Sequence, residues 1–113
     1  AKAFTDQYPC VMVAWAKAQD RAVRMIRDDV DGAAELIGRE FNLDVTEAKR
    51  QMSGLGYLDA SEQASDTWLG GGLAKALQQT AQYLLDQKEI EAVPDEATWN
   101  ASVVKTYAEA AAG

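Results

Sequence analysis

The segment GGGLAKALQQTAQYLLDQKEI, residues 70–90, has the clearest periodic pattern in the chain. After the glycines, apolar residues recur at intervals of three and four, which places them on one face of a helix. This face consists of Leu73, Ala76, Leu77, Thr80, Tyr83 and Leu84, and the opposite face of Lys75, Gln78, Gln79, Gln82 and Asp86. We therefore predict an amphipathic helix whose leucine-rich face is buried and which ends before Pro94.

Three glycines, Gly70 to Gly72, stand directly before this helix. A glycine-rich turn at a helix N-terminus can bind an anion through its backbone N–H groups, and it can also simply join two helices. A phosphate-binding loop follows a strand and places a Lys and a Ser or Thr at fixed positions. Here the glycines follow a helical turn, and Lys75 falls on the outer face. We therefore predict a flexible joint that lets two helices pack closely.

The rest of the chain also has helical periodicity. Pro9 is suited to the first position of a long helix, and Asp29 and Asp44 are suited to cap the two helices that follow. The residues predicted to face inward are Val11, Trp15, Ala18, Ala22, Met25 and Ile26, then Val30, Ala34, Ile37 and Phe41, then Val45, Ala48 and Met52, and finally Trp99, Val103 and Tyr107. No apolar run has the length of a confident strand. We predict one all-α domain, residues 1–113, with about five helices and a core that includes Trp15, Ile37, Leu77 and Leu84.

Composition excludes several functions. The chain has 18 Asp and Glu against 11 Lys and Arg, and its net charge of −7 argues against nucleic acid as a partner. It contains no histidine, which removes the commonest general base and the commonest metal ligand. Its one cysteine, Cys10, has no histidine to activate it. We expect no catalytic residues, no metal site, no cofactor and no enzymatic activity.

Two features remain as candidate binding sites. One feature is a basic row, Lys17, Arg21, Arg24 and Arg27, which could bind an acidic partner. Nearby aspartates reduce its positive electrostatic potential, so we favour a solvated helix face. Tyr57 lies in a connector with few neighbours in its own segment, and binding residues concentrate in such connectors. We therefore predict Tyr57 as a ligand-binding residue.

Three segments resemble periplasmic solute-binding proteins of the sulfonate, taurine and nitrate ABC-transporter class. They are AFTDQYPCVMVAWAKAQDRA (residues 3–22), GYLDASEQ (residues 56–63) and GGGLAKALQQTAQYLLDQKEIEAVPD (residues 70–95). The third segment is similar to the most recognisable C-terminal block of that family. The residues of this chain at the positions that define that block are Lys75-Ala76, Thr80-Ala81, Tyr83, Leu84, Gln87, Ile90, Val93, Pro94 and Asp95. The resemblance extends from about Phe4 to Tyr107.

The chain departs from the family pattern at a few helix ends. Lys88 stands where the family usually has a helix-ending glycine, and Glu91 stands where it has proline. Val30 and Val45 follow their capping residues where proline is common. These departures affect the definition of helix ends more than they affect function.

The resemblance implies a part of a larger protein. Family members are two-lobed α/β proteins that clamp a small anionic solute between the lobes and deliver it to ABC-transporter membrane subunits. This chain would be their C-terminal helical portion, which packs on the sheet of the first lobe, in a periplasmic protein that imports taurine-like sulfonates or related anions. The family's main anion-binding residues lie outside this portion, so none is carried over. Without the sheet, the inward stripes would lack a partner, and we expect the isolated chain to form a homo-oligomer.

Two other interpretations remain open. A free-standing helical interaction module would keep an apolar groove for a partner's helix. An enzyme built on the same binding-protein fold would need catalytic residues that this sequence does not show.

Overall fold

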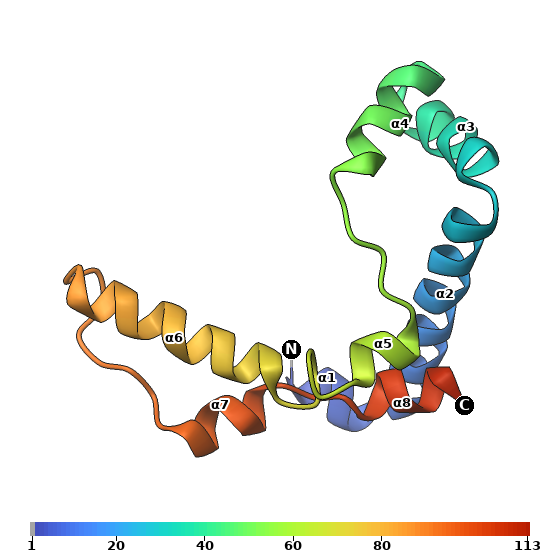
Figure 1. Ribbon diagram of the computed structural model, residues 1–113. Helices are drawn as coiled ribbons and strands as arrows, with labels where there is room; N and C mark the ends of the chain where they lie inside the picture. The colour runs from blue at the N-terminus through green and yellow to red at the C-terminus, as the bar shows by residue number, and fades with distance from the viewer. Residues whose placement is uncertain (1) are drawn as a thin grey trace. The chain divides into compact units, whose positions relative to one another are not determined.

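The computed structural model describes residues 2–113, and this range is helical without any strand (Figure 1). Its helices are α1 (Lys2–Gln7), α2 (Pro9–Asp28), α3 (Val30–Phe41), α4 (Val45–Ser53), α5 (Ala60–Ala64), α6 (Gly72–Asp86), α7 (Glu96–Ser102) and α8 (Thr106–Ala112). The all-α prediction is confirmed.

The predicted number of about five helices is too low, because eight helices are present in residues 2–113. Tyr8 has non-helical backbone angles and separates α1 from α2, since the residue before a proline is disfavoured in the helical region. The predicted tail helix is divided into α7 and α8 by Val103, whose backbone is extended at φ −102° and ψ 117°. The brief turn after Asp59 forms α5.

The helix starts of the first half follow the predicted capping chemistry. Pro9 is in the first turn of α2. The Asp29 carboxylate accepts the Gly32 N–H at 2.8 Å at the start of α3, and the Asp44 carboxylate accepts the Glu47 N–H at 3.0 Å at the start of α4. Each aspartate satisfies a backbone donor that has no partner inside its helix.

The chain divides into two compact units, one ending at Asp59 and one beginning at Ala60. In the first unit, α3 packs against both α2 and α4. Its core consists of Ala33, Ala34, Ala48 and Met52, with Ile26, Ile37 and Tyr57 packed against it. The Arg27 guanidinium ties the connector after α4 to α2, because it donates to the Asp59 carboxylate at 3.2 Å and to the Tyr57 carbonyl.

The predicted inward stripe of α2 is wrong, because the structure leaves most of it exposed. Trp15 is 60% exposed, Met25 53% and Val11 50%, whereas only Ile26 of that set is partly buried. The partly or fully buried residues of α2 are Met12, Val13, Ala16, Asp20, Val23 and Ile26. Helix α2 has two apolar stripes, and periodicity alone does not show which one the neighbouring helices contact.

Helices α3 and α4 bury only part of their predicted inward stripes. In α3, Ala33, Ala34 and Gly38 are buried, whereas Val30 and Phe41, both predicted to face inward, are exposed. In α4, Ala48 and Met52 are buried as predicted and Val45 is not.

The second unit contains α5 packed on α8 and α6 packed on α7. Its buried hydrophobic residues are Ala60, Ala74, Ala81 and Ala108. Helix α6 turns Ala74 and Ala81 inward, with Gln78 and Leu85 partly buried beside them. The predicted leucine-rich face is therefore wrong in part, because Tyr83 is 62% exposed and Leu77 is exposed while Leu84 is partly buried.

The three glycines form a joint between helices, as predicted. Their N–H groups donate to chain carbonyls: Gly70 to Ser65, Gly71 to Trp68 and Gly72 to Asp66, at 2.9, 3.3 and 2.9 Å. Gly71 has φ 150°, and a Cβ on Gly72 would lie 1.8 Å from the Thr67 carbonyl oxygen. Because all three N–H groups are used within the turn, they do not form an anion cradle. The joint is also closely packed around Gly72.

Candidate functional site

An apolar groove lies between the C-terminal half of α2 and α3, with a volume of about 420 Å³. We call it the α2–α3 groove. Its apolar lining consists of Ala22, Met25, Ile26, Ala33, Leu36 and Ile37, together with Gly32. Leu36 is 51% exposed, and Met25 is similarly exposed on the opposite wall. The arrangement can accept apolar side chains of another segment or molecule.

The polar rim of the α2–α3 groove is acidic. Asp28 and Asp29 line the groove, and Asp29 also caps α3. Nearby, the Asp31 carboxylate pairs with Lys49 at 2.7 Å. No Lys or Arg is among the groove's lining residues. A small anion would therefore meet negative charge at this rim, which makes the groove unsuited to a sulfonate.

A row of exposed side chains on α2 continues from the groove. We call Val11, Trp15, Ala18, Ala22 and Met25 the α2 seam, and all five are exposed. Ala22 and Met25 belong to both the seam and the groove. The Tyr8 ring lies at the N-terminal end of the seam and contacts the Phe4 ring at a centroid distance of 5.0 Å. Seam and groove together are an apolar surface on the first unit.

The predicted basic row on α2 is partly neutralised within the chain. Arg24 donates to the Asp20 carboxylate at 2.8 Å, and Arg27 pairs with Asp59. The hydrogen bond that Arg24 donates to Asp20 raises the pKa of Arg24 above its usual value. Asp20 is 8% exposed, so this pair also satisfies a carboxylate that is nearly buried. These contacts favour a solvated, internally paired helix face over a site for an acidic partner.

Tyr57 lies in the connector between α4 and α5, where the sequence places it. Its side chain is partly buried and packs against the core formed by α3 and α4, and its carbonyl accepts a hydrogen bond from Arg27. The ring therefore has a packing role. Its role in ligand binding stays a prediction.

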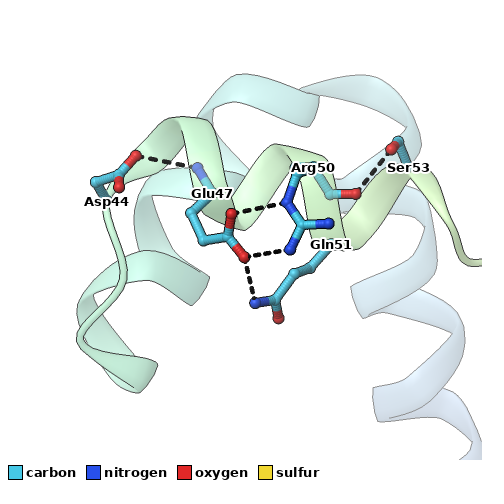
Figure 2. Close-up of polar contacts among 5 residues, drawn as sticks. All are labelled: Asp44, Glu47, Arg50, Gln51 and Ser53. Atoms are coloured by element: carbon cyan, nitrogen blue, oxygen red, sulfur yellow. Dashed lines mark hydrogen bonds and ion pairs between the residues drawn. The ribbon is translucent and has the colours of Figure 1, made fainter.

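A cluster of polar side chains lies on α4 (Figure 2). The Glu47 carboxylate accepts from Arg50 at 2.8 and 2.6 Å and from Gln51 at 2.8 Å. The hydrogen bonds from Arg50 and Gln51 lower the pKa of Glu47 to about 2. All three residues belong to α4, and Arg50 and Gln51 lie three and four positions after Glu47, so the cluster stabilises α4 and does not join separate elements into a site.

Other kinds of site are not evident in residues 2–113. No group of three or more His, Cys, Asp or Glu side chains in this range could hold a metal ion. Cys10 is a free, exposed thiol. Among the described helices, none combines the length and the apolar character needed to cross a bilayer.

Comparisons with known proteins do not identify a relative, because no family model, no curated protein and no solved structure matches the chain. The sequence identified the seam residues from their intervals of three and four but assigned them to the interior, so it did not predict an exposed apolar surface. Leu36 was not selected, because it lies outside the predicted stripe of its helix.

Proposed function

We propose that this chain is the C-terminal helical portion of a solute-binding protein that serves an ABC importer of taurine-like sulfonates or related small anions. The observation that supports the proposal best is the backbone of Lys88, which has φ 62° at the end of α6. In the family that the sequence resembles, a glycine ends this helix at the same place. Left-handed backbone is the conformation for which glycine is favoured at a helix end.

The hydrogen bonds around Lys88 complete this helix end. The Lys88 N–H donates to the Leu85 carbonyl and the Glu89 N–H donates to the Leu84 carbonyl, both at 2.9 Å. These two bonds are the Schellman arrangement, in which the residue after the C-cap is left-handed. The chain therefore keeps the helix-ending geometry associated with glycine even though it has lysine there.

The proposed role of this portion is structural. The acidic rim of the α2–α3 groove is unsuited to an anion, and the glycine N–H groups are used within their turn. The exposed seam of α2 and the exposed Leu77 and Tyr83 of α6 are apolar surfaces that a first lobe would cover. In the intact periplasmic protein, the solute and the membrane subunits would be bound mainly by other parts.

The test is titration calorimetry on the product of the complete reading frame that contains these residues. We expect that product to include an α/β portion and to bind taurine, another alkylsulfonate or nitrate with a Kd near 1 μM, about −8 kcal/mol. The 113-residue chain is the matched control and should give no binding heat with the same solutes. A reading frame without an α/β portion, or an intact product that binds none of these anions, would contradict the proposal.

The second candidate function is a free-standing helical interaction module, and the α2–α3 groove is the observation that favours it. An amphipathic helix can place apolar side chains in such a groove, and the acidic rim suits a partner with basic flanking residues. This function would be favoured by a reading frame that encodes only the helical chain. The interaction-module function also predicts that Leu36→Glu abolishes binding of an amphipathic helix with basic flanking residues.

A further inference from the structure

The α2 seam has the spacing of a coiled-coil interface. Val11, Trp15, Ala18, Ala22 and Met25 follow one another at intervals of four, three, four and three. These intervals define the a and d positions of a heptad, the positions that face a partner helix. They lie in one uninterrupted helix of 20 residues, which is about 30 Å long. Every member of the seam is exposed in the structure.

We propose that two copies of the 113-residue chain pair through their α2 seams in antiparallel orientation. The order of large and small side chains carries this inference. In the proposed register, the residue numbers of any two facing seam residues add up to 33. Trp15 then faces the partner's Ala18, and Val11 faces the partner's Ala22. In the same register Met25 faces the partner's Tyr8, a contact in which a thioether meets an aromatic ring.

The parallel alternative is less complementary. It would place Trp15 against the partner's Trp15 and Ala18 against the partner's Ala18, so that one layer is crowded and the next leaves a void. Crowding and voids both weaken a packed interface. In the antiparallel register Trp15 and Val11 each face an alanine, so neither central layer is crowded or empty, and the larger Met25 and Tyr8 meet only at the two ends of the seam.

The charges beside the seam agree with the antiparallel register. Asp28, at the C-terminal end of α2, comes near the N-terminal end of the partner's α2. The first turn of α2 contains no acidic residue, and a helix N-terminus carries partial positive charge that favours nearby carboxylates. Arg21 flanks the seam one position before Ala22, and in the antiparallel pair it comes beside the partner's Ala14, one position before the partner's Trp15, so the basic residues do not face one another directly. The pairing does not rest on the proposed function, because it concerns the 113-residue chain by itself, in which the α2 seam is exposed.

The first test is sedimentation equilibrium of the 113-residue chain over a range of concentrations. We expect a monomer–dimer equilibrium, and Trp15→Glu should weaken it by at least tenfold. Leu55→Glu, at another exposed apolar position outside the seam, is the matched control and should leave the dissociation constant unchanged. Circular dichroism should show that both variants remain helical. A chain that is monomeric at all concentrations, or one whose association survives Trp15→Glu, would overturn the proposal.

The Ala18→Leu variant distinguishes the antiparallel register from non-specific association of apolar surfaces. In the antiparallel pair the added leucine would crowd the partner's Trp15, and we expect the dissociation constant to rise about ten- to a hundredfold. In a parallel pair, or in non-specific association, the same change adds apolar surface and should tighten the complex. Tighter association of Ala18→Leu would therefore contradict the antiparallel pairing.

A spin label on the single thiol, Cys10, measures the orientation directly. In the proposed register the two labelled residues are separated along the helix axis by 13 positions, about 20 Å. In a parallel pair this axial separation is zero. The measured distance between labels should therefore exceed about 20 Å, and a distance clearly shorter than this would overturn the inference.

Discussion

Lys88 occupies a backbone conformation that costs free energy for any residue with a Cβ. Its φ of 62° lies in the left-handed region, where an L-residue is disfavoured relative to glycine. The two Schellman hydrogen bonds hold it there, since both form only when the chain turns in this way. The helix end is therefore determined by hydrogen bonding despite the residue type at its key position.

Lys88→Gly should raise the free energy of unfolding by about 1 kcal/mol, because glycine adopts this conformation without the steric cost. Urea denaturation measures the change. Lys75→Gly, in the interior of the same helix, is the matched control and should lower stability by about 1 kcal/mol. If both substitutions destabilise the chain, the left-handed backbone at Lys88 is not the one present in solution.

Glu47 makes the stability of α4 depend on pH. Its pKa is lowered from 4.5 to about 2 by the hydrogen bonds from Arg50 and Gln51, so the folded state favours the charged carboxylate. A group with a depressed folded pKa stabilises the fold above its unfolded pKa, and this stabilisation is lost as pH falls through the folded pKa. The affected window is therefore pH 4.5 down to about 2.

Glu47→Gln should be less stable than the natural chain at pH 7 and equally stable near pH 2. Denaturation followed at several pH values in this window measures the difference between the two chains. Glu91→Gln removes the same charge from an exposed position outside α4 and serves as the control. A Glu47→Gln difference that stays constant from pH 7 to pH 2 would rule out the proposed role of the carboxylate.

At the scale of helices, the chain packs through small residues. Ala34 and Ala48 are fully buried between α3 and α4, and Ala74 and Ala81 form the buried face of α6. Alanines let helix backbones approach closely and need little side-chain ordering. Several larger apolar residues of the same helices are exposed instead, among them Leu36, Phe41 and Tyr83.

The two methionines Met52 and Met25 test this arrangement with identical substitutions. Met52 is 6% exposed and belongs to the first-unit core, whereas Met25 is 53% exposed in the seam. Met52→Ala should cost about 2–5 kcal/mol of unfolding free energy. Met25→Ala should cost less than about 0.5 kcal/mol when measured at a concentration where the chain is monomeric. Equal costs would show that the seam is buried within the monomer.

At the scale of the whole molecule, the described residues include no large side chain that is fully buried. Trp15 and Trp68 are exposed, and the buried hydrophobic residues of residues 2–113 are alanines and Met52. Large aromatic and aliphatic side chains normally supply most of the apolar burial that stabilises a domain. The chain therefore has a small core for its length and much apolar surface that a partner or another copy can cover.

Dilute samples of the 113-residue chain should accordingly bind a hydrophobic dye while remaining helical, and acrylamide should quench most of the tryptophan emission. Raising the protein concentration should reduce both effects if α2 seams pair, because Trp15 then becomes covered. Trp15→Glu, which prevents pairing, should abolish this concentration dependence. A native chain that binds no dye and whose tryptophans resist quenching would mean that its apolar side chains are buried in the monomer.

The amino-acid sequence by itself determined the helical class, the starts of α2, α3 and α4 and the end of α4. These depend on local chemistry: Pro9 at a first turn, Asp29 and Asp44 accepting N–H groups of the following residues, and Gly54 after the last residue of α4. Sequence reasoning also placed Tyr57 in its connector and the three glycines at a joint. Each of these features is decided by residues close together in the chain.

Only the tertiary structure decided which face of each helix is buried. Periodicity shows that Trp15 and Met25 share a face, but α2 has a second apolar stripe, and the helix that packs on it selects that stripe. The α2–α3 groove likewise requires the relative placement of two helices, which no local pattern specifies. The physical reason is that burial depends on contacts between residues distant in sequence, whereas capping and turns depend on neighbours.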